Sequence, residues 1–211
     1  MCAISGSTTL DKAFRLYTEG LERGHYGSGL FALTKEVGYI YKQEKPFTID
    51  DIHRWVDDKN EIVYWAFHSR APTNVIHSEW SYEKTHPFRY KGYIVAHNGI
   101  IDNFKSFVES DKFEIDSSII PYHLFENDGN IKTVYEQYTG LLTSWIYDLN
   151  KHKFYIVKGG SSLFKDETSF SSLNFKNSTQ VNDDGIIFEL TENYVLEQRD
   201  IFNYSNPYFI L

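Results

Sequence analysis

Apolar side chains in the first part of the chain recur at helical and then at strand spacing. Between residues 10 and 21 they return every three or four positions until the glycines from Gly24 onward, which predicts a helix. Thr8 and Asp11 have the spacing of a capping box at its start. Shorter apolar segments on either side predict strands near 1–6, 29–33 and 37–41, the last two as a hairpin.

The rest of the chain mixes buried strands with short helices. Residues 62–67 and 93–96 are continuously apolar, which is typical of strands covered on both faces. Thr48 and Asp51 predict the start of a second helix. Further helices are predicted over 117–126 and over 131–139, where Gly140 would end the helix, and strands near 142–148, 153–158, 186–190 and 194–198. The pattern predicts a layered α+β fold with two sheets stacked face to face and helices outside.

Composition narrows the class of protein. The 211 residues are 41% hydrophobic and 17% aromatic, enough for a single domain over 1–211. A net charge of −8 without a basic tract argues against a nucleic-acid surface. No apolar run is long enough for a membrane span, and the first residues lack the pattern of a signal peptide. One cysteine cannot form an internal disulfide, so we expect a cytoplasmic protein. We expect neither a metal ion nor a cofactor.

The one cysteine is Cys2, directly behind the initiator methionine. Removal of Met1 would leave a residue that carries both a thiol and a free α-amine. Their unperturbed pKa values, near ~8.5 and ~7.7–8.0, allow the amine to act as the base for the thiol at neutral pH. The alternative is that Cys2 is an ordinary terminal residue, and position alone does not exclude it.

Polar residues gather where the apolar strands end, in segments 68–73, 85–88 and 97–103. The Asn98-Gly99 pair predicts a turn, which could also offer the Asn98 amide and the Gly99 N–H to an oxyanion. Arg70 could be a solvated charge or could bind a carboxylate through its guanidinium fork. His86 could make a structural hydrogen bond in a loop, and Asp116 could cap a helix.

Taken together and in order, these segments resemble the glutaminase domain of class II glutamine amidotransferases, a family of N-terminal nucleophile hydrolases. The resemblance is strongest over 1–126 and weak thereafter. It rests on six segments, Cys2-Ala3-Ile4, Arg23-Gly24, His68-Ser69-Arg70, His86-Pro87, His97-Asn98-Gly99-Ile100-Ile101 and Asp116-Ser117-Ser118. The sequence departs from the family's usual pattern at Ala3, Tyr26 and Ala71, and Pro121 is expected to interrupt the helix after Asp116.

The resemblance implies a four-layer αββα sandwich of two mainly antiparallel sheets, and a role for each matching residue. Cys2 would attack the side-chain amide of L-glutamine, with its own amine as base, to form a thioester. Asn98 and Gly99 would form the oxyanion hole. Arg70 and Asp116 would bind the α-carboxylate and the α-ammonium, and Thr73 and His86 would line the pocket.

Family members usually continue into a domain that consumes the ammonia. We therefore expect a separate synthetase or transferase subunit as the partner of this chain; the alternative is a glutaminase that acts without an acceptor. Two other functions stay open. The chain could be an N-terminal nucleophile amidohydrolase for another amide, in which case it would need neither Arg70 nor Asp116, or a non-catalytic interaction module in which Met1 is retained.

Overall fold

A computed structural model describes residues 1–56, 61–71, 81–206 and 208 of the chain. All strand pairings that it contains are antiparallel, and they form two sheets. The seven-stranded sheet has the order β11 (Thr179–Gln180), β9 (Phe164–Lys165), β10 (Phe170–Ser171), β1 (Ala3–Ser7), β4 (Tyr64–Arg70), β2 (Gly27–Leu33) and β3 (Gly38–Gln43). The six-stranded sheet has the order β13 (Leu196–Ile201), β12 (Ile186–Leu190), β8 (Lys153–Lys158), β7 (Gly140–Asp148), β6 (Tyr93–Ile101) and β5 (Phe88–Tyr90).

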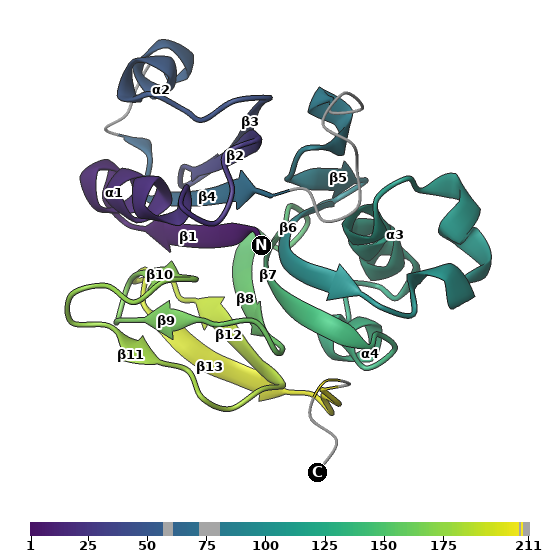
Figure 1. The fold of residues 1–211 in the computed structure, drawn as a ribbon. Helices are drawn as coiled ribbons and strands as arrows, with labels where there is room; N and C mark the ends of the chain where they lie inside the picture. The colour runs from purple at the N-terminus through teal and green to yellow at the C-terminus, as the bar shows by residue number, and fades with distance from the viewer. Residues whose placement is uncertain (57–60, 72–80, 207, 209–211) are drawn as a thin grey trace.

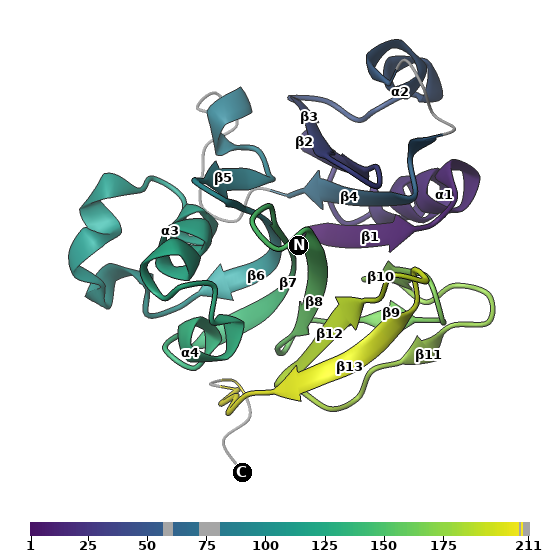
Figure 2. The ribbon, with the colours of Figure 1, turned by 180° about the vertical axis from the view of Figure 1, so that it is seen from behind.

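Helices cover the outer face of each sheet (Figures 1 and 2). Helices α1 (Leu10–Gly20) and α2 (Ile49–Trp55) pack on the seven-stranded sheet, where Tyr17 and Ile52 join Trp65 and Phe67 in one buried cluster. Helices α3 (Ile119–Glu126) and α4 (Ile131–Tyr135) pack on the six-stranded sheet through a second cluster. The predicted αββα sandwich is confirmed. None of the helices in the described part of the chain is long and apolar enough to cross a membrane.

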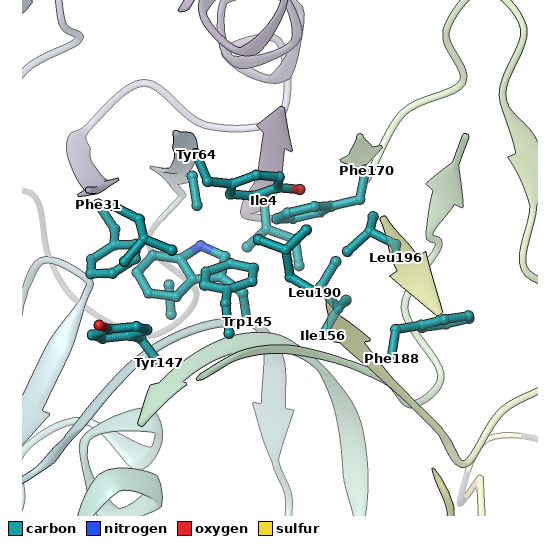
Figure 3. Close-up of a cluster of buried hydrophobic side chains, with 14 of the residues drawn as sticks. Ile4, Phe31, Tyr64, Trp145, Tyr147, Ile156, Phe170, Phe188, Leu190 and Leu196 are labelled. Atoms are coloured by element: carbon teal, nitrogen blue, oxygen red, sulfur yellow. The ribbon is translucent and has the colours of Figure 1, made fainter. Parts of the chain in front are cut away.

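A third cluster fills the space between the sheets and contains Ile4, Tyr64, Trp145 and Ile156 (Figure 3). Successive side chains of a strand point to opposite faces, so one alternate set of each central strand faces this layer. In β4 the set begins with Tyr64 and Ala66, and in β6 with Ile94 and Ala96. The same alternation, followed toward the strand ends, reaches the polar residues described below.

Local sequence signals identify some element ends correctly and others not. The capping box at α2 is confirmed, because the Thr48 hydroxyl accepts from the Asp51 N–H while the Asp51 carboxylate accepts from the Thr48 N–H. The capping box at Thr8 is wrong, since α1 follows Thr9, which makes no side-chain cap.

Two of the later predictions also need correction. The helix predicted over 131–139 ends at Tyr135, and Gly140, with φ of +123°, begins β7 instead of ending that helix. Pro121 does not interrupt a helix: it is the third residue of α3, where the backbone N–H groups have no partner within the helix in any case.

Candidate functional site

The alternation of side chains along the central strands points Cys2, Arg70 and Asn98 into the layer between the two sheets, which we call the inner layer. Ala3 pairs with Ser69 in the β1–β4 ladder, so Cys2 and Arg70 are the next residues on the two strands. Arg70 follows Ala66 at even spacing on β4, and Asn98 follows Ala96 on β6. The amino end of β1, in the seven-stranded sheet, lies beside β6 of the other sheet (Figures 1 and 2). Segments distant in sequence thus meet at one end of the inner layer.

The Cys2 side chain is half-buried, and its thiol donates to the Ala71 carbonyl oxygen at 3.6 Å. Burial raises the pKa of the Cys2 thiol, while Arg70 and the chain's terminal amine act to lower the pKa and Asp116 acts to raise it. The thiol therefore interacts electrostatically with both charged residues that the sequence assigns to substrate binding. A cationic neighbour favours the thiolate form, here against the larger effect of burial.

Arg70 is the last residue of β4 and is only 6% exposed. Burial lowers the pKa of its guanidinium, and the neighbouring Cys2 and Asp116 act to raise it. The sequence left open whether Arg70 is a solvated surface charge, and its burial excludes that interpretation. A buried guanidinium at this end of the inner layer is suited to bind a carboxylate.

Asn98 and Gly99 do not form the predicted turn. They lie within β6, where they pair with Thr143 and Leu142 of β7, and the strand continues to Ile101. Asn98 is buried at 2% exposure, and its amide donates to the Ser172 hydroxyl at 3.0 Å. Gly99 is needed for close approach, because a Cβ at this position would lie 1.7 Å from the Leu141 carbonyl oxygen.

Asp116 begins a 3₁₀ turn over Asp116–Ser118, directly before α3. One carboxylate oxygen accepts from the Ile101 N–H at 2.7 Å, and the other accepts from the Ser117 hydroxyl at 3.2 Å. Its side chain is therefore not the helix cap considered from the sequence, since it accepts the N–H at the end of β6. This contact fixes the carboxylate beside the strand that carries Asn98.

Three buried histidines surround these residues. His97 holds the turn at Asp116, because its Nδ1 lies 2.8 Å from the Ser117 hydroxyl. His68 connects the sheets through Nε2, 3.1 Å from the His97 carbonyl oxygen. The ring of His86 packs on that of His68 at 4.0 Å between centroids, and neither His86 nitrogen has a hydrogen-bond partner among the described residues. Burial is the main cause that lowers the pKa of His68 to about 3 and holds the pKa of His86 well below its usual range.

The Arg23-Gly24 segment borders the same end of the inner layer. A Cβ at Gly24 would lie 2.4 Å from the Ala71 nitrogen, so only glycine permits this approach to the end of β4. The Arg23 carbonyl accepts from the terminal amine of Met1 at 3.5 Å. The segment thus lies beside the residue whose removal would free the α-amine of Cys2.

Arg70 and Asp116 interact with the Cys2 thiol, and His86 interacts with Arg70. Asn98 is joined to Ile4 of β1 through the Ser172 hydroxyl, and Gly99 follows Asn98 on β6. Thr73 lies outside the described residues. Sequence reasoning missed Ser172, whose hydroxyl accepts from both Asn98 and the Ile4 N–H. Ser172 lies in the region where the resemblance is weak, and no local pattern marks a serine after a two-residue strand.

Comparison with solved structures identifies the fold. The chain superposes on glutamine phosphoribosylpyrophosphate amidotransferase from B. subtilis with a TM-score of 0.66 and 14% identity, covering 94% of this chain and 49% of that one. The structure of the allosteric regulatory enzyme of purine biosynthesis gives a TM-score of 0.65 and 17% identity, covering 94% of this chain and 48% of that one. A glutamine aminotransferase class-II domain protein from Silicibacter pomeroyi gives 0.54 and 12%, covering 96% and 100%. The predicted resemblance to class II glutamine amidotransferase domains is confirmed at the level of the fold.

Sequence comparison adds a weaker likeness. The chain is 27% identical over 120 residues to a glutamine–fructose-6-phosphate aminotransferase (isomerizing) from Francisella tularensis subsp. tularensis, which is 49% of this chain and 17% of that protein. The chain thus spans a small part of this curated relative, and about half of the first two solved structures. No protein-family model matches the chain.

Proposed function

We propose that this chain hydrolyses L-glutamine to L-glutamate and ammonia, with Cys2 as the nucleophile. The observation that carries the proposal is the position of Cys2 beside Arg70 across the β1–β4 ladder, with the Asp116 carboxylate held at the end of β6. A substrate with both a carboxylate and an ammonium group matches a site that offers a guanidinium and a carboxylate beside a thiol.

The reaction begins with loss of Met1, which converts the Cys2 nitrogen from an amide into a free amine. This amine takes the thiol proton, and the sulfur attacks the side-chain amide carbon of glutamine. When the tetrahedral intermediate collapses, the carbon–nitrogen bond breaks and the amine returns its proton to the departing ammonia. The resulting thioester is attacked by a water molecule, which releases glutamate and restores the thiol.

Asn98 and Gly99 would stabilise the negative charge on the amide oxygen in both tetrahedral intermediates. A donor held in a buried strand requires little reorganisation during the reaction. Arg70 would hold the α-carboxylate, Asp116 the α-ammonium, and His86 would line the pocket together with Thr73, which lies outside the described residues. The paired charges favour glutamine over a neutral amide, because a substrate with a carboxylate and an ammonium group gains an ionic contact with each of them and a neutral substrate gains neither.

The test is glutamate release from glutamine by the purified chain with Met1 removed. Cys2→Ala should abolish release and Cys2→Ser should nearly abolish it, whereas both variants keep the melting temperature because the side chain is small and half-buried. Asparagine, shorter by one methylene, serves as the control substrate and should not be consumed. Release by Cys2→Ala at the rate of the unchanged chain would contradict the proposal.

We further propose that the ammonia is transferred to an acceptor on a separate synthetase or transferase subunit. The similar proteins are named amidotransferases or aminotransferases, which supports transfer of the nitrogen rather than its loss to water. The single cysteine supports the cytoplasm as the compartment. If the purified chain alone turns over at a rate that no protein from its host increases, partner dependence is wrong while glutamine hydrolysis stands.

A further inference from the structure

We propose that Ser172 is a positioning residue that holds the Asn98 amide in the orientation needed to stabilise the oxyanion. The proposal rests on the glutaminase function proposed above and names a residue that the motifs of the first 126 positions do not include. The Ser172 hydroxyl accepts the Asn98 Nδ2–H at 3.0 Å and the Ile4 N–H at 3.0 Å. One side chain thus connects β6, which carries Asn98, to β1, which begins one residue after Cys2.

Ser172 is itself fixed on β1 by the backbone. Its N–H donates to the Ile4 carbonyl at 2.9 Å, while its hydroxyl accepts from the Ile4 N–H. The two contacts continue the antiparallel ladder in which Ser171 pairs with Ser5. Ser172 is 0% exposed, so no solvent competes for its hydroxyl. The position of this oxygen is therefore set by the strand that leads to the nucleophile.

The contact restricts what the Asn98 amide can do. An asparagine amide has two N–H donors, and Ser172 accepts one of them. The amide is then fixed about its last side-chain torsion, and the second N–H points in one direction. Without the hydroxyl, the amide could rotate between two broad orientations, and only one would present a donor to the substrate. Because oxyanion stabilisation depends on a donor that is oriented before the reaction, Ser172 would act on turnover.

The Ser162 hydroxyl connects the Ser172 backbone to Arg23. The Ser162 hydroxyl donates to the Ser172 carbonyl at 2.8 Å and accepts from the Arg23 guanidinium at 3.0 Å. Arg23 is the residue whose own carbonyl accepts from the terminal amine of Met1. The chain of contacts from Asn98 through Ser172 thus ends at Met1, the residue whose removal would free the α-amine of Cys2.

The test measures glutamine turnover for the unchanged chain, Ser172→Ala, Asn98→Ala and the double variant, all with Met1 removed. Ser172→Ala should lower kcat by roughly 10- to 100-fold, as expected for a misplaced catalytic donor, and should change KM little. The double variant should be no slower than Asn98→Ala alone, because Ser172 acts only through that amide. Ser172→Thr, which retains the hydroxyl, should recover most of kcat.

Ser171→Ala is the matched control. Ser171 is adjacent and equally buried, and its hydroxyl accepts from the Leu173 N–H rather than from Ile4 or Asn98. Its loss should leave kcat unchanged. The alkylation rate of Cys2 by iodoacetamide should be the same in all these variants, since this displacement forms no oxyanion and reports only an intact thiol.

The outcomes separate this inference from the function on which it rests. An unchanged chain that releases no glutamate contradicts the proposed function and this inference with it. Two results with an active chain would contradict only the role of Ser172. In the first, Ser172→Ala keeps full kcat. In the second, the fall in kcat of the double variant is the product of the falls in the two single variants. If Ser172→Ala does not fold, Ser172→Cys keeps the shape of the side chain with a slightly larger thiol that is only a weak acceptor, and its kcat is judged by the same two results.

Discussion

Cys2 and Arg70 are neighbours across two antiparallel strands, one residue beyond the Ala3–Ser69 pair of the β1–β4 ladder. The positive charge of Arg70 acts to lower the pKa of the Cys2 thiol, against the larger effect of burial. The same guanidinium is the group proposed to hold the α-carboxylate of glutamine. Substrate binding and the reactivity of the nucleophile are thus linked through one buried residue.

Arg70→Lys should raise KM more than it lowers kcat. Lysine keeps the charge but loses the planar fork that binds a carboxylate through two hydrogen bonds. We expect KM to rise roughly tenfold, which corresponds to about 1.4 kcal/mol of binding free energy. The measurement is a glutamine saturation curve for both proteins, with Arg89→Lys, at an exposed position, as the control. Equal KM values for Arg70→Lys and the unchanged chain would show that the carboxylate is bound elsewhere.

Asn98→Ala should act on turnover, because an oxyanion donor interacts more strongly with the transition state than with bound glutamine. Loss of one such donor typically lowers kcat by roughly 10²–10³, or about 2.7–4 kcal/mol. Steady-state kinetics at saturating glutamine gives this value directly. Asn103→Ala is the control, since the Asn103 amide only joins the backbone at Gln137 and Thr139. An Asn98→Ala protein with normal kcat and a lower melting temperature would leave Asn98 a structural residue.

Asp116→Asn separates the charge of this side chain from its structural hydrogen bond. The asparagine oxygen can still accept from the Ile101 N–H, as one Asp116 oxygen does at 2.7 Å, so the melting temperature should change little. The substrate ammonium would lose its ionic partner, and KM should rise roughly tenfold or more. The exposed Asp111→Asn is the matched control. A loss of stability with an unchanged KM would assign Asp116 to the fold alone.

Because it contains buried histidines, we expect the folded chain to lose stability in mild acid. Burial lowers the pKa of His68 to about 3, whereas an unfolded chain protonates its histidines near 6.5. Below that value the unfolded chain binds protons that the folded chain does not, so the free energy of unfolding falls as the pH decreases. The contribution of each such histidine approaches ~1.4 kcal/mol per pH unit and persists until the folded pKa is reached.

Urea unfolding between about pH 4.5 and 7.5 measures the slope of the free energy of unfolding against pH. This slope is proportional to the difference between the numbers of protons bound by the unfolded and folded states. His68→Gln should make the slope shallower while keeping a donor near the His97 carbonyl. His53→Gln, at an exposed position, should leave the slope unchanged. The same slope in His68→Gln and in the unchanged chain would show that His68 is protonated in the folded state.

The sequence predicts features that depend on neighbouring residues better than features that depend on strand pairing. The cap of α2 depends only on Thr48 and Asp51, three positions apart, and it was predicted correctly. Asn98-Gly99 was predicted as a turn because these residues usually form one. Nine residues of β7 pair with β6 instead, and this continuous ladder overrides the local preference.

The site was predicted from the order of its motifs rather than from geometry. The pairing of β1 with β4 and the stacking of the two sheets bring Cys2, Arg70 and Asp116 together. The spacing of residues along the chain reveals neither the strand pairing nor the stacking. The contact between Ile4 and Ser172 joins positions 168 residues apart. Only the folded arrangement reveals such a partner, which is why Ser172 was missed.

The most direct test of the proposed chemistry is mass spectrometry of the chain after reaction with 6-diazo-5-oxo-L-norleucine, an electrophilic analogue of glutamine. The analogue carries the same α-carboxylate and α-ammonium as glutamine and forms a stable bond with a nucleophile that attacks its side chain. We predict a chain that begins at Cys2 and carries one adduct on that residue, and we predict that excess glutamine prevents the labelling. A retained Met1, an adduct at another residue, or labelling that glutamine does not reduce would contradict the account.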